Sequence, residues 1–117
     1  NQAIEFRRAY NIRNDLQKRD LQKSLIVEEF KEFLQSHQQM QIMHPQDRAD
    51  CLKELADLVY VCAQYAENMD WDLVQALRRV HKSNMSKLGE DGKPIYREDG
   101  KVLKGPNYQP PDLSDLV

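Results

Sequence analysis

The sequence predicts an all-α fold, an antiparallel helical bundle that is followed by a short C-terminal β-hairpin and an extended proline-rich tail. Two long segments, residues 19–38 and 47–69, carry apolar side chains at helical spacing. After Gly89 this spacing stops, and Asp-Gly pairs and prolines replace it. We therefore expect one domain of 117 residues, with a helical core over 1–88 and the hairpin and tail over 89–117.

The first half of the chain predicts one short helix and two long ones. Residues 1–10 mix apolar and charged side chains at helical spacing, and residues 11–18 are polar and indicate a connection. The two long helices are separated by a loop at 39–46, because Pro45 biases His44 away from helical conformation. Antiparallel packing of the two long helices would bring their acidic side chains together.

A third long helix is expected over residues 71–87. Asp70 is the predicted N-cap residue, and Asp72 is favourably placed in the first turn. The apolar stripe of this helix ends in polar side chains, at Asn84 and Lys87. Those two side chains either extend a functional surface or mark the place where the helix frays into water.

Two Glu-Asp-Gly-Lys turns, at 90–93 and 98–101, bracket a short apolar run. Because Asp-Gly between apolar runs favours a tight turn, these residues predict a small β-hairpin. The segment 110–113 is Pro-Pro-Asp-Leu and does not favour a helix. We expect it to lie over the rest of the protein or over a neighbouring subunit.

Composition narrows the class of protein. Charged residues make up 31% of the chain, but the net charge is only −2, so there is no basic field for general nucleic-acid binding. A chain of 117 residues with much apolar helical surface can finish burying that surface against another copy, which predicts a homo-oligomer.

Cysteines and hydropathy predict a cytoplasmic protein. Cys51 and Cys62 lie on one predicted helix about 16 Å apart, which is beyond the reach of a disulfide, so both are expected to be reduced core residues. No apolar run approaches the length of a membrane span, and no signal-peptide pattern opens the chain.

Two pairs of acids lie on the apolar faces of the two long helices. Glu29 and Glu32 share the apolar arc of the first helix, and Glu54 and Asp57 lie on or beside that of the second. An acid on a packing face is normally protonated, paired with a base or bound to a cation, and few bases lie on these faces. Oxygen ligands favour Mg²⁺, with Mn²⁺ as a substitute. The alternative is two solvated acidic faces.

Asn84, Lys87 and a lysine-bearing tail complement such a metal site. Carboxylates hold Mg²⁺, Mg²⁺ holds phosphate oxygens, and Lys and Asn side chains neutralise and orient the outer phosphates. The sequence has no glycine-rich phosphate loop, so side chains and metal would hold the phosphates instead. The pattern therefore indicates polyphosphate chemistry.

The order of these motifs resembles the all-α NTP pyrophosphatase superfamily, which includes MazG-like proteins, dimeric dUTPases and phosphoribosyl-ATP pyrophosphohydrolases. The resemblance covers most of the chain and rests on Glu29-x-x-Glu32, Glu54-x-x-Asp57, Asn84 and Lys87. A small phage and bacterial subgroup of MazG-like nucleotide pyrophosphohydrolases is similar in later segments, at Val80–Lys87, Asp91–Pro94 and Lys104–Tyr108.

The resemblance implies Mg²⁺-dependent hydrolysis of a nucleoside triphosphate, NTP or dNTP, between its α and β phosphates, in the cytoplasm of a bacterium or a phage-infected host. The products would be a nucleoside monophosphate and pyrophosphate. The implied Mg²⁺ ligands are Glu29, Glu32, Glu54 and Asp57.

The catalytic carboxylate is drawn from one of these acids or Glu28. It would orient or deprotonate a water that attacks the α-phosphorus, and the choice among Glu28, Glu29 and Glu32 stays open. The implied phosphate contacts are Asn84, Lys87, Lys104 and Tyr108.

The base pocket is not specified by these motifs. By position, the candidates for stacking and hydrogen bonding to the base are Phe6, Tyr10, Asn11 and Asn14. Because some small phage members serve purine nucleotide metabolism, including dGTP breakdown, the resemblance favours a purine, with dGTP first. It also implies a homodimer or homotetramer with shared active sites, in which Lys104 and Tyr108 would close over the substrate.

Two alternatives remain. One is a phosphoribosyl-ATP pyrophosphohydrolase, which would share the four acids. The other is a non-enzymatic helical interaction module whose acids bind no metal and whose tail docks a partner.

Overall fold

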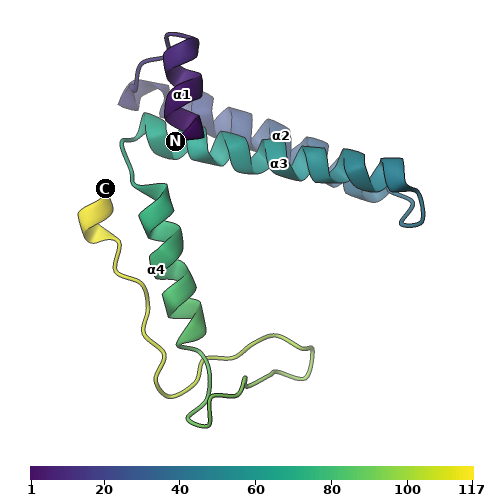
Figure 1. The fold of residues 1–117 in the computed structure, drawn as a ribbon, viewed down its shortest axis with the longest axis vertical. Helices are drawn as coiled ribbons and strands as arrows, with labels where there is room; N and C mark the ends of the chain where they lie inside the picture. Colours follow the sequence, from purple (N-terminus) through teal and green to yellow (C-terminus); the bar gives the residue numbers. More distant parts are fainter. The chain divides into compact units, whose positions relative to one another are not determined.

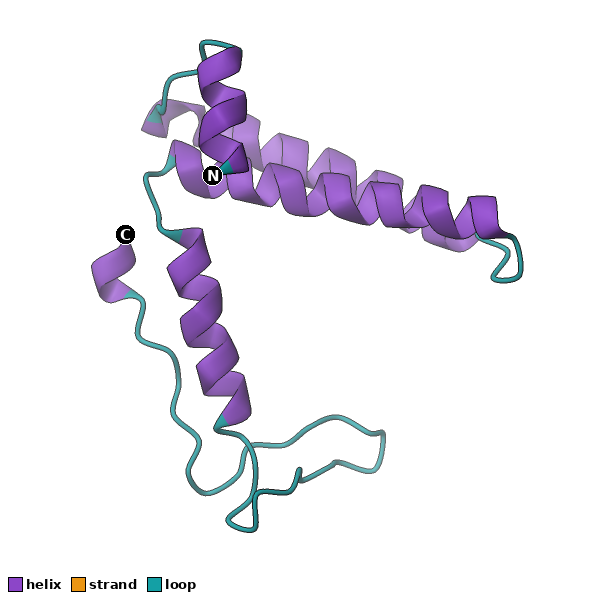
Figure 2. Cartoon of the chain, viewed as in Figure 1, coloured by secondary structure: helices purple, strands orange, loops and turns teal.

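The computed structural model describes residues 1–117 and is all-helical, as the sequence predicts. Four α-helices and two short 3-10 turns are present, and no β-strand forms (Figure 2). The chain divides into two compact units, Asn1–Trp71 and Asp72–Val117, which are described separately below. No helix combines the length and the apolar character that a membrane span would require.

Helices α2 (Arg19–Gln39) and α3 (Pro45–Asn68) form a long antiparallel hairpin (Figure 1). Pro45 opens α3, where its missing N–H costs nothing because the first-turn amides have no partner within the helix. The loop between the helices is tied down by Asp47, whose carboxylate accepts a hydrogen bond of 2.9 Å from the backbone N–H of Gln41. The predicted pair of long helices is confirmed.

Helix α1 (Gln2–Ala9) packs on α3 (Figure 1). Its N-cap is Asn1, whose side-chain oxygen accepts a hydrogen bond of 2.9 Å from the N–H of Ile4. The helix ends before Asn11, which has a left-handed φ of 54° that asparagine tolerates better than most residues. A 3-10 turn, η1 (Leu16–Lys18), then leads directly into α2.

A buried polar network fastens α1 and the following loop to α3. The guanidinium of Arg7 donates hydrogen bonds of 2.9 to 3.2 Å to the side-chain oxygens of Asn14, Gln64 and Asn68 and to the carbonyl of Arg13. Asn68 in turn bonds to both backbone groups of Asp15. We call Arg7, Asn14, Gln64 and Asn68 the Arg7 network.

The apolar core of the first unit is small. The only buried apolar residues are Ala3, Cys51 and Ala66. By contrast, large apolar side chains on both long helices remain exposed, including Leu21, Phe30, Leu34, Leu52, Leu55 and Val59. The chain therefore leaves much of its apolar surface in contact with solvent.

Helix α4 (Leu73–Met85) starts later than predicted. Asp72, not Asp70, is the N-cap residue, and its carboxylate accepts a hydrogen bond of 3.0 Å from the N–H of Gln75. Asp70 instead takes a left-handed φ of 59° just after α3, a conformation that ends a helix. An Asp at either position satisfies the sequence pattern, and the left-handed conformation of Asp70 excludes it as the N-cap residue.

The predicted β-hairpin does not form. The two turns are present, with Gly92 and Gly100 at φ values of 75° and 89°, but the arms between them meet in a single isolated antiparallel bridge of Tyr96 with Val102. Every residue from 90 to 104 is exposed. A two-stranded ribbon with no face buried against other elements has little to stabilise further pairing.

Residues 105–117 run back along α4 (Figure 1) and end in the 3-10 turn η2 (Ser114–Leu116). Ser83 donates to the carbonyl of Gln109 over 2.8 Å, and the N–H of Gln109 donates to Ser86 over 3.0 Å. Arg79 forms a two-pronged ion pair with Asp115. These bonds tie the tail to one side of the helix.

Candidate metal and nucleotide site

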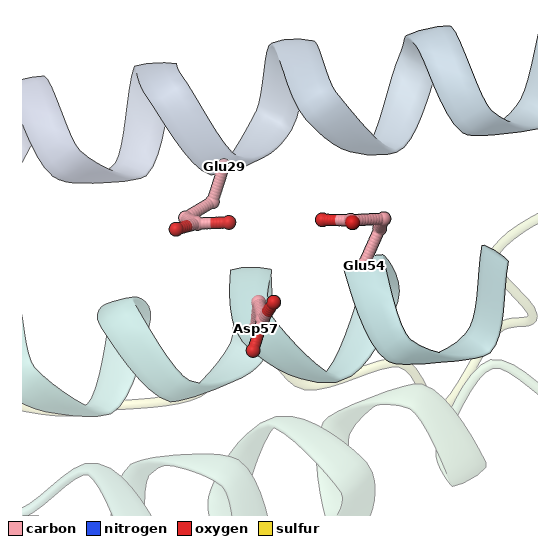
Figure 3. A group of neighbouring side chains, drawn as sticks. All are labelled: Glu29, Glu54 and Asp57. Atoms are coloured by element: carbon pink, nitrogen blue, oxygen red, sulfur yellow. The ribbon is translucent and has the colours of Figure 1, made fainter. Parts of the chain in front are cut away.

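Three of the four predicted metal ligands converge between α2 and α3. Glu29 projects from α2 toward α3, Glu54 projects from α3 toward α2, and Asp57 lies beside them on α3 (Figure 3). One carboxylate oxygen from each residue lies within 4.8 Å of the other two. The helical spacing of Glu54 and Asp57 puts both acids on the side of α3 that faces α2, which is why the antiparallel hairpin assembles the group. We call these three residues the acid cluster.

The other two predicted acids lie beside this cluster. Glu32 is exposed one turn beyond Glu29 on α2, and it does not contribute an oxygen to the group of three. Glu28 is exposed as well. Both remain candidates for a role at the edge of the cluster.

The acid cluster holds more negative charge than its surroundings neutralise. Burial raises the pKa of Glu29 above its ordinary value, and the carboxylates of Glu32, Asp57 and Glu54 raise it further because they disfavour another negative charge. The only cation paired with the acids is Lys53, whose Nζ lies 2.8 Å from Asp57 Oδ2 and 3.4 Å from Glu54 Oε1. No cation is paired with Glu29.

Two oxygens of the cluster have no hydrogen-bond partner. Glu29 Oε2 and Glu54 Oε2 are both buried and unpaired. An unpaired buried carboxylate oxygen is costly, and a divalent cation held by these carboxylates would offset that cost. The set consists only of hard oxygen ligands from half-buried side chains, so the residues present fit Mg²⁺ or Mn²⁺.

A polar hollow of about 510 Å³ adjoins the acid cluster. It lies along α2 and α3 and is lined by Glu32, Gln35, Gln39, Asp50, Lys53 and Glu54, among others. Sequence reasoning missed Gln35, Gln39 and Lys53. Of these three residues, Lys53 could have been found from the sequence. It lies four residues before Asp57 and therefore on the same face of the helix.

The aromatic candidates for base binding form a cluster of their own. Phe6 and Tyr10 of α1 stack with ring centres 4.6 Å apart, and Tyr60 of α3 meets Phe6 edge-on at 5.7 Å. These three rings line an open hollow of about 380 Å³. Tyr60 was not predicted, because its position on α3 faces α1 only once the helices pack.

The two asparagine candidates differ in availability. Asn14 has both polar atoms engaged, since its oxygen accepts from Arg7 and its nitrogen donates to Asp70 over 2.8 Å. Asn11 is exposed at the left-handed turn after α1.

The four predicted phosphate contacts all belong to the second unit. Asn84 is exposed near the end of α4, and Lys87 follows the helix. Lys104 places its ammonium 4.8 Å from the centre of the Tyr108 ring, a cation–π arrangement that keeps the two side chains together. The N–H of Gly105 donates to the carbonyl of Lys87 over 2.7 Å, which connects the two lysine-bearing segments.

A comparison with protein families finds one matching model, described as phosphoribosyl-ATP pyrophosphohydrolase, over residues 7–84. The match covers more than half of the chain and includes both acidic pairs. It ends at Asn84, so Lys87, Lys104 and Tyr108 lie outside it. A search of the curated proteins found no match.

Proposed function

The chain belongs to the phosphoribosyl-ATP pyrophosphohydrolase family, a pyrophosphohydrolase family of the all-α NTP pyrophosphatase superfamily, and from this premise we propose that it hydrolyses a nucleoside triphosphate. The proposed reaction depends on Mg²⁺ and cleaves the bond between the α and β phosphates. It releases a nucleoside monophosphate and pyrophosphate.

The observation that carries this proposal is the acid cluster, with its two unpaired buried oxygens. Glu29, Glu54 and Asp57 would hold the metal ion, and Glu32 is close enough to Glu29 to join them when a ligand is bound. When bound, the ion would supply charge neutralisation at the phosphates and activation of the attacking water.

Side chains of the protein would accept the proton of the attacking water and bind the phosphates. A carboxylate of Glu28 or Glu32 would accept the proton of the water that attacks the α-phosphorus, while the bridging oxygen leaves with pyrophosphate. Both carboxylates are exposed, so a water can reach them. Asn84, Lys87, Lys104 and Tyr108 would bind the phosphates.

Base recognition is assigned to α1 and its surroundings. The rings of Phe6, Tyr10 and Tyr60 offer stacking surfaces around an open hollow, and Asn11 offers a free amide. Asn14 is a weaker candidate, because binding a base would break its bonds to Arg7 and Asp70. We propose a purine nucleotide as substrate, with dGTP first.

We also propose a homodimer or homotetramer. An apolar groove of about 430 Å³ runs over α1 and α3, and two of its lining side chains, Leu52 and Val59, are 65% and 61% exposed. Exposed apolar faces of this kind usually mark an interface. Light scattering after gel filtration measures the mass in solution, and a monomer at working concentration would refute this part.

The reaction is tested with a panel of NTPs and dNTPs in the presence of Mg²⁺, with products separated by chromatography. We expect pyrophosphate and the monophosphate, and loss of at least about 100-fold in rate for Glu54→Gln, which removes a charged ligand. Glu98→Gln is the matched control, because Glu98 is exposed in the turn region of the second unit. Release of orthophosphate, or full activity of Glu54→Gln, would refute the proposal.

Phosphoribosyl-ATP is the second candidate substrate, and the description of the matching family favours it. The two substrates are compared by kcat/KM under identical conditions. A value for phosphoribosyl-ATP at least tenfold above that for every nucleoside triphosphate would replace the first proposal with the second.

A non-enzymatic helical module is the third candidate. It predicts that Mg²⁺ and Mn²⁺ leave the melting temperature unchanged, whereas a metal site that exists only in the folded state raises the melting temperature by mass action. The thermal melt therefore separates the enzyme from the module without any substrate.

A further inference from the structure

Lys53 pairs with two of the carboxylates that form the acid cluster. Its ammonium lies 2.8 Å from Asp57 Oδ2 and 3.4 Å from Glu54 Oε1, so it contacts both α3 members of the cluster. Helix α2 contributes Glu29 and Glu32 to the same region and no base that pairs with them. Lys53 is therefore the sole side-chain cation paired with the cluster.

We infer that Lys53 is a built-in counter-ion, which competes with the divalent cation for Asp57 and Glu54 and swings away when the cation binds. This inference rests on the metal site of the proposed function. It adds a residue next to that site whose role is to set the metal affinity, not to ligate the metal.

The exposure of Lys53 supports displacement of its ammonium by a cation over permanent pairing with Glu54 and Asp57. The Lys53 side chain is 66% exposed, whereas that of Glu54 is 21% exposed, so the ammonium approaches the cluster from the solvent side. A lysine has a flexible four-carbon stem, and an exposed ion pair is weak, so releasing it costs little. Glu29 Oε2 and Glu54 Oε2 stay unpaired in its presence, so the ammonium satisfies only part of the cluster.

The released ammonium would remain near the substrate. Lys53 also lines the polar hollow beside the cluster, together with Gln35 and Gln39. In the metal-free protein the lysine reduces repulsion among the acids, and in the metal-bound protein it leaves a positive charge at the rim of this hollow. One side chain thus serves both states.

The test is calorimetric titration of the 117-residue chain with Mn²⁺, without nucleotide. Lys53→Met should bind Mn²⁺ about three- to tenfold more tightly than the wild type. Coulomb's law in water gives about tenfold for a unit charge roughly 6 Å from a dication, and screening by salt lowers this value.

Two variants serve as controls. Lys31→Met makes the same change in net charge from an exposed position on α2, and it should alter the affinity less than twofold. Lys53→Arg keeps a positive charge that can pair with both acids, so it should bind Mn²⁺ no more tightly than the wild type.

The measured affinities distinguish the counter-ion role of Lys53 from the existence of the metal site. If Lys53→Met binds Mn²⁺ no more tightly than Lys31→Met, the counter-ion role is refuted and the metal site stands. If the wild-type chain binds no Mn²⁺ at all, the metal site of the proposed function and the counter-ion role are both refuted. If Lys53→Met binds Mn²⁺ more weakly than the wild type, Lys53 assists metal binding and the inference is reversed.

Discussion

Replacing Arg7 by methionine should destabilise the first unit strongly. Arg7 is only 3% exposed, and its guanidinium donates to the side chains of Asn14, Gln64 and Asn68 and to the carbonyl of Arg13. Methionine keeps much of the apolar volume but removes all of the donors. The substitution thus isolates the polar contribution of the Arg7 network.

The expected loss of unfolding free energy follows from the oxygens that Arg7→Met leaves without a hydrogen-bond donor. Gln64 is 6% exposed and Asn68 is 1% exposed, so water does not readily replace the lost donor at either oxygen. An unsatisfied buried polar group costs about 1–3 kcal/mol. Asn68 keeps the bond from the N–H of Asp15, which places its share at the low end. Removal of a buried charge offsets part of the loss, so we expect a net destabilisation of about 2–4 kcal/mol.

Urea unfolding followed by far-ultraviolet circular dichroism measures this change at a fixed protein concentration, because oligomerisation would otherwise shift the midpoint. The control is Arg8→Met, which removes the neighbouring exposed arginine and should change stability by less than about 0.5 kcal/mol. If Arg7→Met unfolds within about 0.5 kcal/mol of Arg8→Met, water replaces the guanidinium and the network does not fasten α1 to α3.

Three further predictions concern single residues. Because the folded pKa of Glu29 is raised above its ordinary value of 4.5, the metal-free protein should lose stability as pH rises from 4.5 through the folded pKa, and Glu29→Gln should flatten this slope in thermal melts. Gly105→Ala would place its Cβ in steric overlap with the backbone carbonyl oxygen of Leu88, so it should detach the tail and speed amide exchange there. Asp72→Ala removes the cap hydrogen bond to Gln75 and should lower stability in urea unfolding by about 1 kcal/mol, with Asp72→Asn close to the wild type.

The helical hairpin and the three residues of the acid cluster could be predicted from the sequence. Apolar spacing defines α2 and α3, and the same arithmetic puts Glu29 and Glu54 on the faces that meet. Glu32 lies on the same predicted arc and is exposed beside the cluster, because an apolar arc is broad and does not define how closely each side chain approaches the partner helix.

The Arg7 network could not be predicted from the spacing of apolar residues in the sequence. Arg7 stands among charged residues in the sequence and lies next to another arginine, so its pattern is that of a solvated face. Its burial depends on side-chain oxygens of α3 that are distant in the sequence. Asn68, which accepts one of its hydrogen bonds, lies 61 residues away. Long-range polar satisfaction of this kind has no local signature.

In residues 90–104 the sequence predicted a β-hairpin that the structure does not contain. The Asp-Gly pairs correctly predict positive φ at Gly92 and Gly100, but turn chemistry alone does not make strands. Strand pairing needs a face to bury, and the residues around Tyr96 and Val102 are exposed. Local signals therefore located the reversals of the chain but not the structure between them.

The location of the acid cluster within one helical hairpin has a consequence for how the protein forms. Glu29 precedes Glu54 by 25 residues and Asp57 by 28, whereas Phe6 and Tyr60 are 54 residues apart. Because contacts that are closer in sequence lose less entropy on forming, we expect the acid cluster to form before the aromatic cluster. The aromatic hollow, in contrast, requires α1 to dock on α3. A substitution in α1 that disturbs this docking should therefore leave the helical hairpin and its acid cluster in place.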